Sequence, residues 1–173
     1  MERIITLASL AHHRALTSLD DLTLARNLYP VPPEHIKSLV SIVTGEVHLR
    51  DVKNCDLVSL FGSINCDQLK LDGVETTEAE IEALVEALRF RTRKLIIYEI
   101  RLLKREEIDK LTQYRGDGVC ESILFTYEFI YVYDEEEADI KIEDIKSWGA
   151  AINWKVDQTK AEDEWELEIY KPM

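Results

Sequence analysis

The side chains that could do chemistry are few and widely spaced along this 173-residue chain. Its four histidines are His12, His13, His35 and His48. Adjacent residues on a helix point about 100° apart, so His12 and His13 are a poor pair of ligands for one metal ion. The sequence contains no H-E-x-x-H zinc motif and no G-x-S-x-G nucleophile motif. We therefore expect no enzymatic activity, no metal site and no cofactor.

The three cysteines, Cys55, Cys66 and Cys120, form no C-x-x-C pair and suggest no disulfide framework. Burial as small core residues is their simplest role, and sparse cysteines are typical of a reducing compartment. The first residues show no cleavage pattern after an apolar block, and no apolar run is long enough for a transmembrane helix. We expect a cytoplasmic protein that inserts into no membrane.

Two short motifs have structural explanations. Arg115, Gly116 and Asp117 spell an integrin-binding tripeptide, but the Gly-Asp-Gly sequence at 116–118 is ordinary turn chemistry. The acidic run at 134–137 lacks the ligand spacing of a calcium loop and fits a solvated loop. Neither motif predicts a site.

The chain is acidic, with 34 acidic and 21 basic side chains and a formal net charge of −13. Nucleic acid and anionic membranes would repel such a chain, whereas a basic protein could bind it. Residues 89–105 are an exception, because they carry seven basic side chains and one acidic one. A solvated helix end and loop explains this stretch, and a binding patch is the alternative.

The elements that would position any site follow a leucine pattern. Residues 16–27 match the L-x-x-L-x-L-x-x-N core of a leucine-rich repeat, with Asn27 at the polar position. Leu22 and Leu24 alternate with Thr23, as a short strand with one buried face requires. Four further strand-like cores, at 47–49, 69–71, 95–97 and 123–125, follow at intervals of 22 to 28 residues. Leucine-rich repeats have periods of roughly 20–29 residues.

Segments with helical spacing separate these strand cores. Helices are predicted over 34–43, 56–64, 77–88 and 104–114, and Thr77 with Glu80 forms a capping box at the start of the third. Each unit would consist of a strand, a turn and a helix, and stacked units would bury surfaces that no unit buries alone. The parallel strands would line the concave side of an arc and the helices its convex side.

The last third of the chain departs from this pattern and holds all three tryptophans. An aromatic and β-branched stretch at 122–133 precedes a predicted helix at 140–150 and a hairpin of strands at 152–156 and 165–170. Large aromatic residues beside charged ones suit the cap of a solenoid. The predicted fold is an α/β leucine-rich-repeat solenoid over 1–121, with about four units and a leading helix. A terminal repeat with a capping helix and hairpin would occupy 122–173.

The N-terminal end lacks a comparable cap. Residues 1–16 have the spacing of a helix from a preceding repeat, so the predicted array would begin in mid-unit. We expect the chain to belong to something longer, or to associate with itself through the uncapped end.

The units resemble those in the leucine-rich-repeat tails of animal NOD-like receptors. Residues 69–89, LKLDGVETTEAEIEALVEALR, have the strand-then-helix form of that class. The closing segment, with GDGVCESILF and DIKSWGAAINWKV, resembles the end of such tails in invertebrate members. The nucleotide-binding loop G-x-x-x-x-G-K-[ST] of these receptors does not occur in this sequence. The resemblance therefore implies only the sensing or autoinhibitory tail of an innate-immune receptor.

The predicted function is that of a non-enzymatic protein-interaction module whose concave strand face holds a protein or microbial ligand. Arg50 and Tyr98 are the expected anchors, because Arg and aromatic side chains dominate binding surfaces. Residues 95–98 are all apolar, so the sequence does not decide which of them face the concave side. A slip of one residue would exchange the two faces of this strand. The predicted ligand-binding residues are Thr23, His48, Arg50, Lys70, Asp72, Ile96, Tyr98, Leu124 and Thr126.

Two alternatives stay open at this point. An acidic array of the ribonuclease-inhibitor type could clamp a basic protein, and its affinity would then fall steeply as salt rises. The chain could also be an orphan structural fragment without a ligand.

Overall fold

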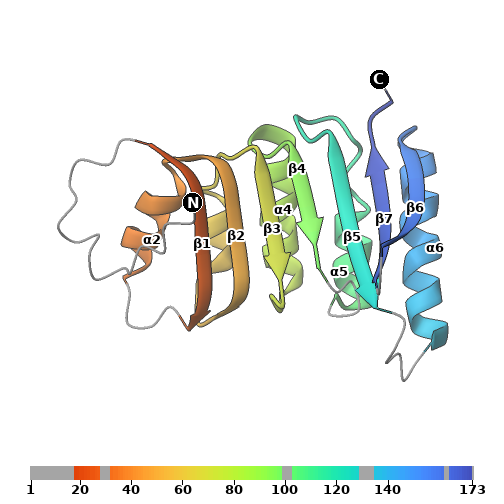
Figure 1. The fold of residues 1–173 in the computed structure, drawn as a ribbon, viewed down its shortest axis with the longest axis horizontal. Helices are drawn as coiled ribbons and strands as arrows, with labels where there is room; N and C mark the ends of the chain where they lie inside the picture. The colour runs from red at the N-terminus through yellow and green to blue at the C-terminus, as the bar shows by residue number, and fades with distance from the viewer. Residues whose placement is uncertain (1–17, 28–31, 99–102, 129–134, 162–163, 173) are drawn as a thin grey trace.

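The computed structural model describes residues 18–27, 32–98, 103–128, 135–161 and 164–172. These residues form a seven-stranded sheet with the strand order β1-β2-β3-β4-β5-β7-β6 (Figure 1). Strands β1 to β5 run parallel to their neighbours, whereas β7 is antiparallel to both β5 and β6. The strands are β1 (Leu19–Asn27), β2 (Val43–Lys53), β3 (Gln68–Asp72), β4 (Lys94–Ile97), β5 (Ser122–Glu128), β6 (Lys155–Ala161) and β7 (Glu164–Tyr170).

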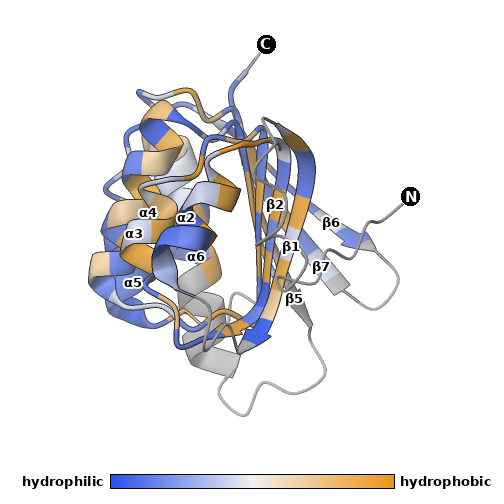
Figure 2. Ribbon diagram, turned by 90° about the vertical axis from the view of Figure 1, so that its left-hand side faces the viewer, coloured by the Kyte–Doolittle hydropathy of each residue, from blue (hydrophilic) through white to orange (hydrophobic). Residues whose placement is uncertain are grey.

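The helices lie on one face of this sheet, which leaves the opposite face without a covering helix in the described part of the chain (Figure 2). Helices α2 to α5 each connect two consecutive parallel strands, and α6 precedes the final hairpin. They are α2 (Pro33–Val40), α3 (Leu57–Phe61), α4 (Glu78–Phe90), α5 (Arg105–Leu111) and α6 (Glu135–Ala151).

The core lies between the sheet and the helices. Alternate residues of each strand face the helices, and the register places them in rows across the sheet. One such row contains Val47, Leu69, Leu95 and Ile123, all completely buried. Because each buried side chain of this size contributes about 1.5–3 kcal/mol, these rows determine which face of the sheet turns inward.

Helix α4 has the clearest local determinants. The Glu80 carboxylate accepts a hydrogen bond from Thr77 N at 2.7 Å, in the capping box that the sequence predicts. Ile81, Leu84 and Leu88 are completely buried on the side that faces the sheet. Capping and an apolar stripe thus agree, and α4 is the longest helix between the parallel strands.

Two cysteines lie just before strands β3 and β5. Cys66 Sγ donates a hydrogen bond to Gln68 O, and Cys120 Sγ donates one to Ser122 O. Both side chains are buried in the core, as expected of small core residues. Burial raises the pKa of the Cys66 thiol to about 11 and that of Cys120 to about 12, so both remain protonated at neutral pH.

Tryptophans join the last helix and the hairpin to the parallel part. Trp148 Nε1 on α6 donates a hydrogen bond to Tyr114 O at 2.8 Å. The Tyr114 ring meets the ring of Trp154 edge-on, with centroids 6.1 Å apart. The C-terminal segment is therefore packed into the same core.

The prediction of a leucine-rich-repeat solenoid with a C-terminal cap is wrong. The five strand cores do lie in β1 to β5, but the sheet is mixed, and β7 pairs with β5 from Ser122↔Tyr170 to Glu128↔Glu164. The hairpin extends the sheet instead of closing an arc. The connecting helices have 8, 5, 13 and 7 residues and the five parallel strands 9, 11, 5, 4 and 7, so no unit is repeated.

Several predictions concern residues outside the described ranges. The helix proposed over 1–16, with His12 and His13, lies there, and so do residues 129–133 of the aromatic stretch. Self-association through the N-terminal end stays a prediction. The division of the chain at residue 121 also stays a prediction, although strands from both sides of this residue belong to one sheet. No helix among the described residues is long and apolar enough to span a membrane.

Candidate functional site

The structure brings the predicted binding residues together on the sheet face that no helix covers, here called the helix-free face. Register partners on neighbouring strands form a row across it. From β1 to β5, this row consists of Thr23, His48, Lys70, Ile96 and Leu124. It continues on β7 and β6 with Glu168 and Asp157.

A second row on this face holds the remaining predicted residues. Arg50 and Asp72 are register partners, Tyr98 N donates to Leu71 O at 2.8 Å, and Thr126 lies opposite Glu166. The Tyr98 ring centroid is 6.2 Å from that of His48, which places both side chains on the same face.

The open question about strand β4 is settled by its register. Ile97 pairs with the inward-facing Leu71, and Ile96 pairs with Lys70. Ile96 therefore belongs to the helix-free face, although only 6% of its surface is exposed.

Ion pairs connect strands β2 and β3 on the helix-free face. Lys70 Nζ lies 2.8 Å from Glu46 Oε2, and Gln68 Nε2 donates to the same oxygen at 2.7 Å. Partial desolvation alone would lower the pKa of the Lys70 ammonium. The hydrogen bond and charge of Glu46 outweigh that effect and hold the pKa above its ordinary value. The Lys70 ammonium is therefore charged throughout the physiological range.

A second charged group surrounds Asp72. Arg50 Nε lies 3.3 Å from Asp72 Oδ2, and His48 Nε2 lies 3.7 Å from the same oxygen. The longer separation is no hydrogen bond, and His48 Nε2 is a buried atom with no hydrogen-bond partner among the described residues. Without a bonded hydroxyl or thiol there, this imidazole forms no nucleophile–base pair within the described chain.

Carboxylates prevail on the hairpin side of the helix-free face. Lys94 Nζ lies 3.6 Å from Glu168 Oε1, and Tyr170 Oη donates to Asp157 Oδ2 at 2.5 Å. Among the side chains that the structure describes on this face, six carboxylates outnumber four basic groups. The acidic residues are Asp21, Glu46, Asp72, Asp157, Glu166 and Glu168, and the basic ones are Arg50, Lys70, Lys94 and Lys155.

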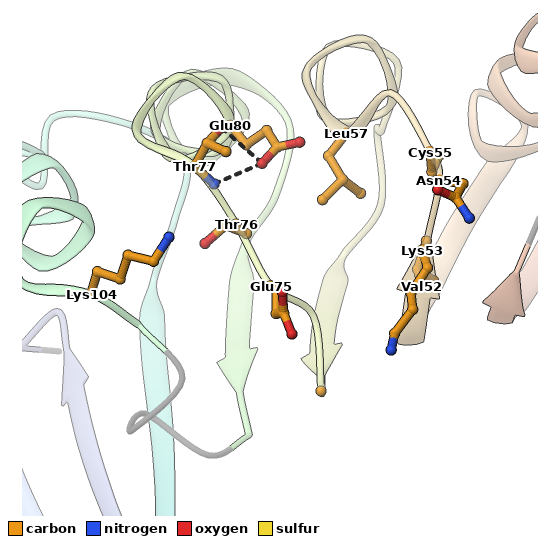
Figure 3. A pocket seen from close by; sticks show the side chains of 11 residues that line it. Val52, Lys53, Asn54, Cys55, Leu57, Glu75, Thr76, Thr77, Glu80 and Lys104 are labelled. Carbon is orange, nitrogen blue, oxygen red and sulfur yellow. Dashed lines mark hydrogen bonds between the residues drawn. The ribbon is translucent and has the colours of Figure 1, made fainter.

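A second candidate site lies at the carboxyl ends of β2 and β3, where the chain turns toward α3 and α4 (Figure 3). Sequence reasoning did not find it. This carboxyl-edge cavity has a volume of about 680 Å³, within the range of about 300–1,000 Å³ typical of small-molecule sites. Its polar lining includes Lys53, Asn54, Glu75, Thr76, Thr77 and Lys104.

Local backbone conformation shapes the cavity wall. Asn54 and Gly73 follow β2 and β3 with φ of 55° and 60°, in the left-handed region that permits sharp turns. Behind the wall, Thr76 Oγ1 donates to the buried Glu107 carboxylate at 3.1 Å. The available signal was an Asn or Gly a few residues after a predicted strand core, at Asn54 and Gly73. The sequence alone does not show which other residues lie near these turns.

The other sequence features are dispersed. His35 is exposed on α2, and Gly116 turns the chain with φ 70° in the tripeptide after α5. Bases of the 89–105 stretch pair with carboxylates in different directions: Arg89 with Glu86, Arg93 with Asp67, Lys94 with Glu168, and Arg105 with Asp144. This stretch is spread over several surfaces and forms no single patch among the described residues.

No family model matches the chain, and no curated protein is significantly similar to it. Among solved structures, the chain is similar to the magnesium protoporphyrin IX methyltransferase ChlM from Synechocystis PCC 6803 with bound SAM. The two share 10% sequence identity with a TM-score of 0.37, over 95% of this chain and 76% of that one. A likeness at that level supports no inference about methyl transfer or about the fold.

The predicted identity as an innate-immune sensor tail is wrong. It presupposed a leucine-rich-repeat solenoid, and the observed sheet is mixed and has no repeated unit. No family model and no curated relative links the chain to NOD-like receptors. The ribonuclease-inhibitor-like array and the orphan fragment of such an array presupposed the same solenoid, so both alternatives are wrong as well. The positions of the predicted binding residues do not depend on that identity.

Proposed function

We propose that the protein is a non-catalytic binding protein whose helix-free face holds a protein partner with basic side chains. The supporting observation is an apolar centre on an uncovered sheet. Ile96, Leu124 and Tyr98 lie together on adjacent strands, and no helix of the described chain covers them. Of the three, Tyr98 and Leu124 are partly exposed, and aromatic side chains such as that of Tyr98 are enriched among the anchors of protein contacts.

Charged side chains surround this centre in a way that suits selective association. On one side, Lys70 and Arg50 are already paired with Glu46 and Asp72. On the other side, Glu166 and Glu168 lie on β7 beside Thr126 and Leu124. Because carboxylates are in excess, a partner with Lys or Arg side chains would be attracted and an acidic one repelled.

The cytoplasm is the compartment we propose for this contact. Cys55, Cys66 and Cys120 are all free thiols, and the latter two are buried. Free and sparse cysteines are usual in reducing compartments, where disulfides do not persist.

Site-specific photo-crosslinking tests the proposed face. A photoreactive phenylalanine analogue would replace Tyr98 in the full chain, and a matched variant would carry it at Ser38, which is exposed on α2. We expect a discrete crosslinked protein from position 98 and none from position 38, because only the first probe faces the proposed partner. Mass spectrometry then identifies the partner.

Two further measurements test whether the apolar centre and the charges of this face bind the partner. Replacing Leu124 by Asp should abolish binding of the crosslinked partner, and raising the salt concentration should weaken binding to the unmodified protein. Equal crosslinking from positions 38 and 98, or a partner that binds equally well to the Leu124→Asp variant, would overturn the proposal.

A further inference from the structure

The side chains of the helix-free face are ordered across the strands. In the middle row, histidine and lysine come first, apolar side chains follow and carboxylates come last. From β2 to β6 in sheet order, this row consists of His48, Lys70, Ile96, Leu124, Glu168 and Asp157. The next row toward the carboxyl ends of the parallel strands consists of Arg50, Asp72, Tyr98, Thr126, Glu166 and Thr159. A partner that matches this order must cross the strands.

The acidic end of these two rows is accessible. Glu166 is partly exposed on β7 and forms no ion pair within the described ranges. Glu168 pairs with Lys94, but the charged atoms are 3.6 Å apart and the side chains are 36% and 38% exposed. Asp157 is exposed on β6 and accepts a hydrogen bond from Tyr170 Oη. Because solvent reaches all three carboxylates, basic side chains of a partner can reach them too.

The opposite end of the rows already has its charges paired. Lys70 Nζ lies 2.8 Å from Glu46 Oε2, and Arg50 Nε lies 3.3 Å from Asp72 Oδ2. Acidic side chains of a partner would have to compete with these carboxylates. The partner therefore needs basic side chains over β7 and β6, but no matching acidic ones over β2 and β3.

The spacing of the strands suits an α-helix on this face. Neighbouring strands are about 4.8 Å apart, and an α-helix rises about 5.4 Å per turn. A helix that lies across the strands therefore places about one turn over each strand. The two rows are about 6.8 Å apart, and one helix with a diameter of about 10–12 Å covers both. An extended segment repeats its same-face side chains about every 6.8 Å and would fall out of step with the strands.

We propose that the partner presents an amphipathic α-helix that lies across the strands of the helix-free face. Its apolar side chains would contact Leu124 and Tyr98, which are partly exposed. Its Lys or Arg side chains would lie about one to two turns further along, over Glu166, Glu168 and Asp157. This inference rests on the proposed function and specifies the shape of the partner.

Synthetic peptides test the helix without knowledge of the natural partner. The first probe is a stapled helix with two leucines on successive turns and three lysines on the next turns of the same face. The second has the same composition, but its lysines lie on the opposite face. The third repeats the first sequence without the staple and with a central proline, which prevents an intact helix. Each is titrated into the full-length protein up to millimolar concentration while the backbone amide signals are followed by NMR.

We expect only the first probe to shift the amides of Tyr98, Leu124 and Glu168 along a saturable curve. The second probe cannot contact the apolar centre and the carboxylates at once, and the third cannot match the strand spacing. Binding of the third probe as tight as that of the first, or no binding of the first, would overturn the inference.

Variants test the orientation of the helix. The double variant Glu166→Gln/Glu168→Gln should weaken binding of the first probe roughly tenfold, because two charge pairs are lost. The matched control Glu34→Gln/Glu106→Gln removes the same charge from exposed positions on α2 and α5 and should leave binding unchanged. Equal affinity of the two double variants would show that the helix does not cross to β7.

The two proposals can fail separately. A protein captured at position 98, together with a first probe that does not bind, would overturn the helix and leave the proposed function standing. A first probe that binds through the carboxylates of β7, with no protein captured at position 98, would support the helix and overturn the proposed function.

Discussion

The two sides of the sheet are built from the same strands but stabilised in different ways. On the helix-covered side, neighbouring strands present Val47, Leu69 and Leu95, which are completely buried. On the helix-free side, the same strands present ion pairs such as Lys70–Glu46 and a small apolar centre around Ile96. The covered side therefore carries most of the stability through burial, and the free side is available for recognition.

The carboxyl edge of the sheet belongs to neither side. β2 and β3 are followed by the left-handed residues Asn54 and Gly73, and a cavity lies between the loops that begin there. Alternation along a strand determines which way a side chain points, but it does not determine what happens where strands end. A flat surface and a concave site can therefore coexist in one sheet.

The largest effect should separate the two sides of one strand. Leu49 is completely buried, and its neighbour Arg50 has a side chain that is 62% exposed on the free side. Leu49→Ala should lower the free energy of unfolding by about 2–5 kcal/mol because it leaves a cavity. Arg50→Ala should change it by no more than about 0.5 kcal/mol. Urea unfolding measures both, and similar values for the two variants would show that the sides are not as distinct as their burial suggests.

The sequence predicted the strands and their faces well for a physical reason. Leu22 and Leu24 alternate with Thr23, and the same alternation in β2 and β3 specifies which residues are buried. Helix α4 was likewise predictable, since the Thr77–Glu80 capping box is a local signal. These features depend only on residues close together in the chain.

The fold class and the cavity depended on distant residues. Strand β7 returns to pair antiparallel with β5, although its alternation is compatible with either direction. A hairpin that extends a sheet and one that caps an arc have the same local pattern, so the solenoid prediction failed there. Lys53 and Lys104 belong to different elements far apart in the chain, and only the folded structure places them at one cavity.

Alkaline pH should lower the free energy of unfolding through two buried thiols on the helix-covered side. In the folded protein, the pKa of the Cys66 thiol is raised to about 11 and that of Cys120 to about 12. Below pH 9 both thiols are protonated in the folded and the unfolded state, so the free energy of unfolding is higher there than at strongly alkaline pH. As pH rises above 9, the unfolded thiols ionise first, so this stability is lost toward pH 11–12. We expect a loss of about 2 kcal/mol between pH 9 and 10 from the two thiols together.

Variants isolate the contribution of the thiols. Urea unfolding at pH 9 and pH 10 should show a smaller drop for Cys66→Ala/Cys120→Ala than for the unmodified protein. Cys55→Ser is the matched control, because Cys55 is only half-buried and lies at the cavity. A double variant that loses as much stability as the unmodified protein would show that these thiols do not cause the alkaline effect.

A smaller change in the free energy of unfolding is expected at the carboxyl edge of the sheet. Gly73 has φ 60°, and a Cβ added there would overlap Asp51 Oδ1. Gly73→Ala should therefore cost about 1–2 kcal/mol of unfolding free energy, since an L residue in this conformation is strained. Asn153→Gly provides the opposite change at φ 60° on the far side of the molecule and should be neutral within about 0.5 kcal/mol or slightly stabilising. Thermal unfolding of both variants would reveal whether the edge is strained in this way.

The smallest effect concerns the ion pairs of the helix-free face. A double-mutant cycle with Glu46→Gln and Lys70→Met should give a coupling energy of about 0.5–1 kcal/mol, because both side chains are less than one-third exposed. The raised pKa of Lys70 means that this contribution is fully present at neutral pH and is lost as the ammonium deprotonates at strongly alkaline pH.

The pair Arg93–Asp67 is the matched control for that cycle. Its charged atoms are 3.7 Å apart and its side chains are 64% and 70% exposed, so its coupling energy should be close to zero. Added salt should weaken the Glu46–Lys70 coupling only partly, since desolvated charges are screened less than exposed ones. Equal coupling in the two pairs would mean that the helix-free face is as well solvated as any other surface, and its charges would then be poor determinants of a partner.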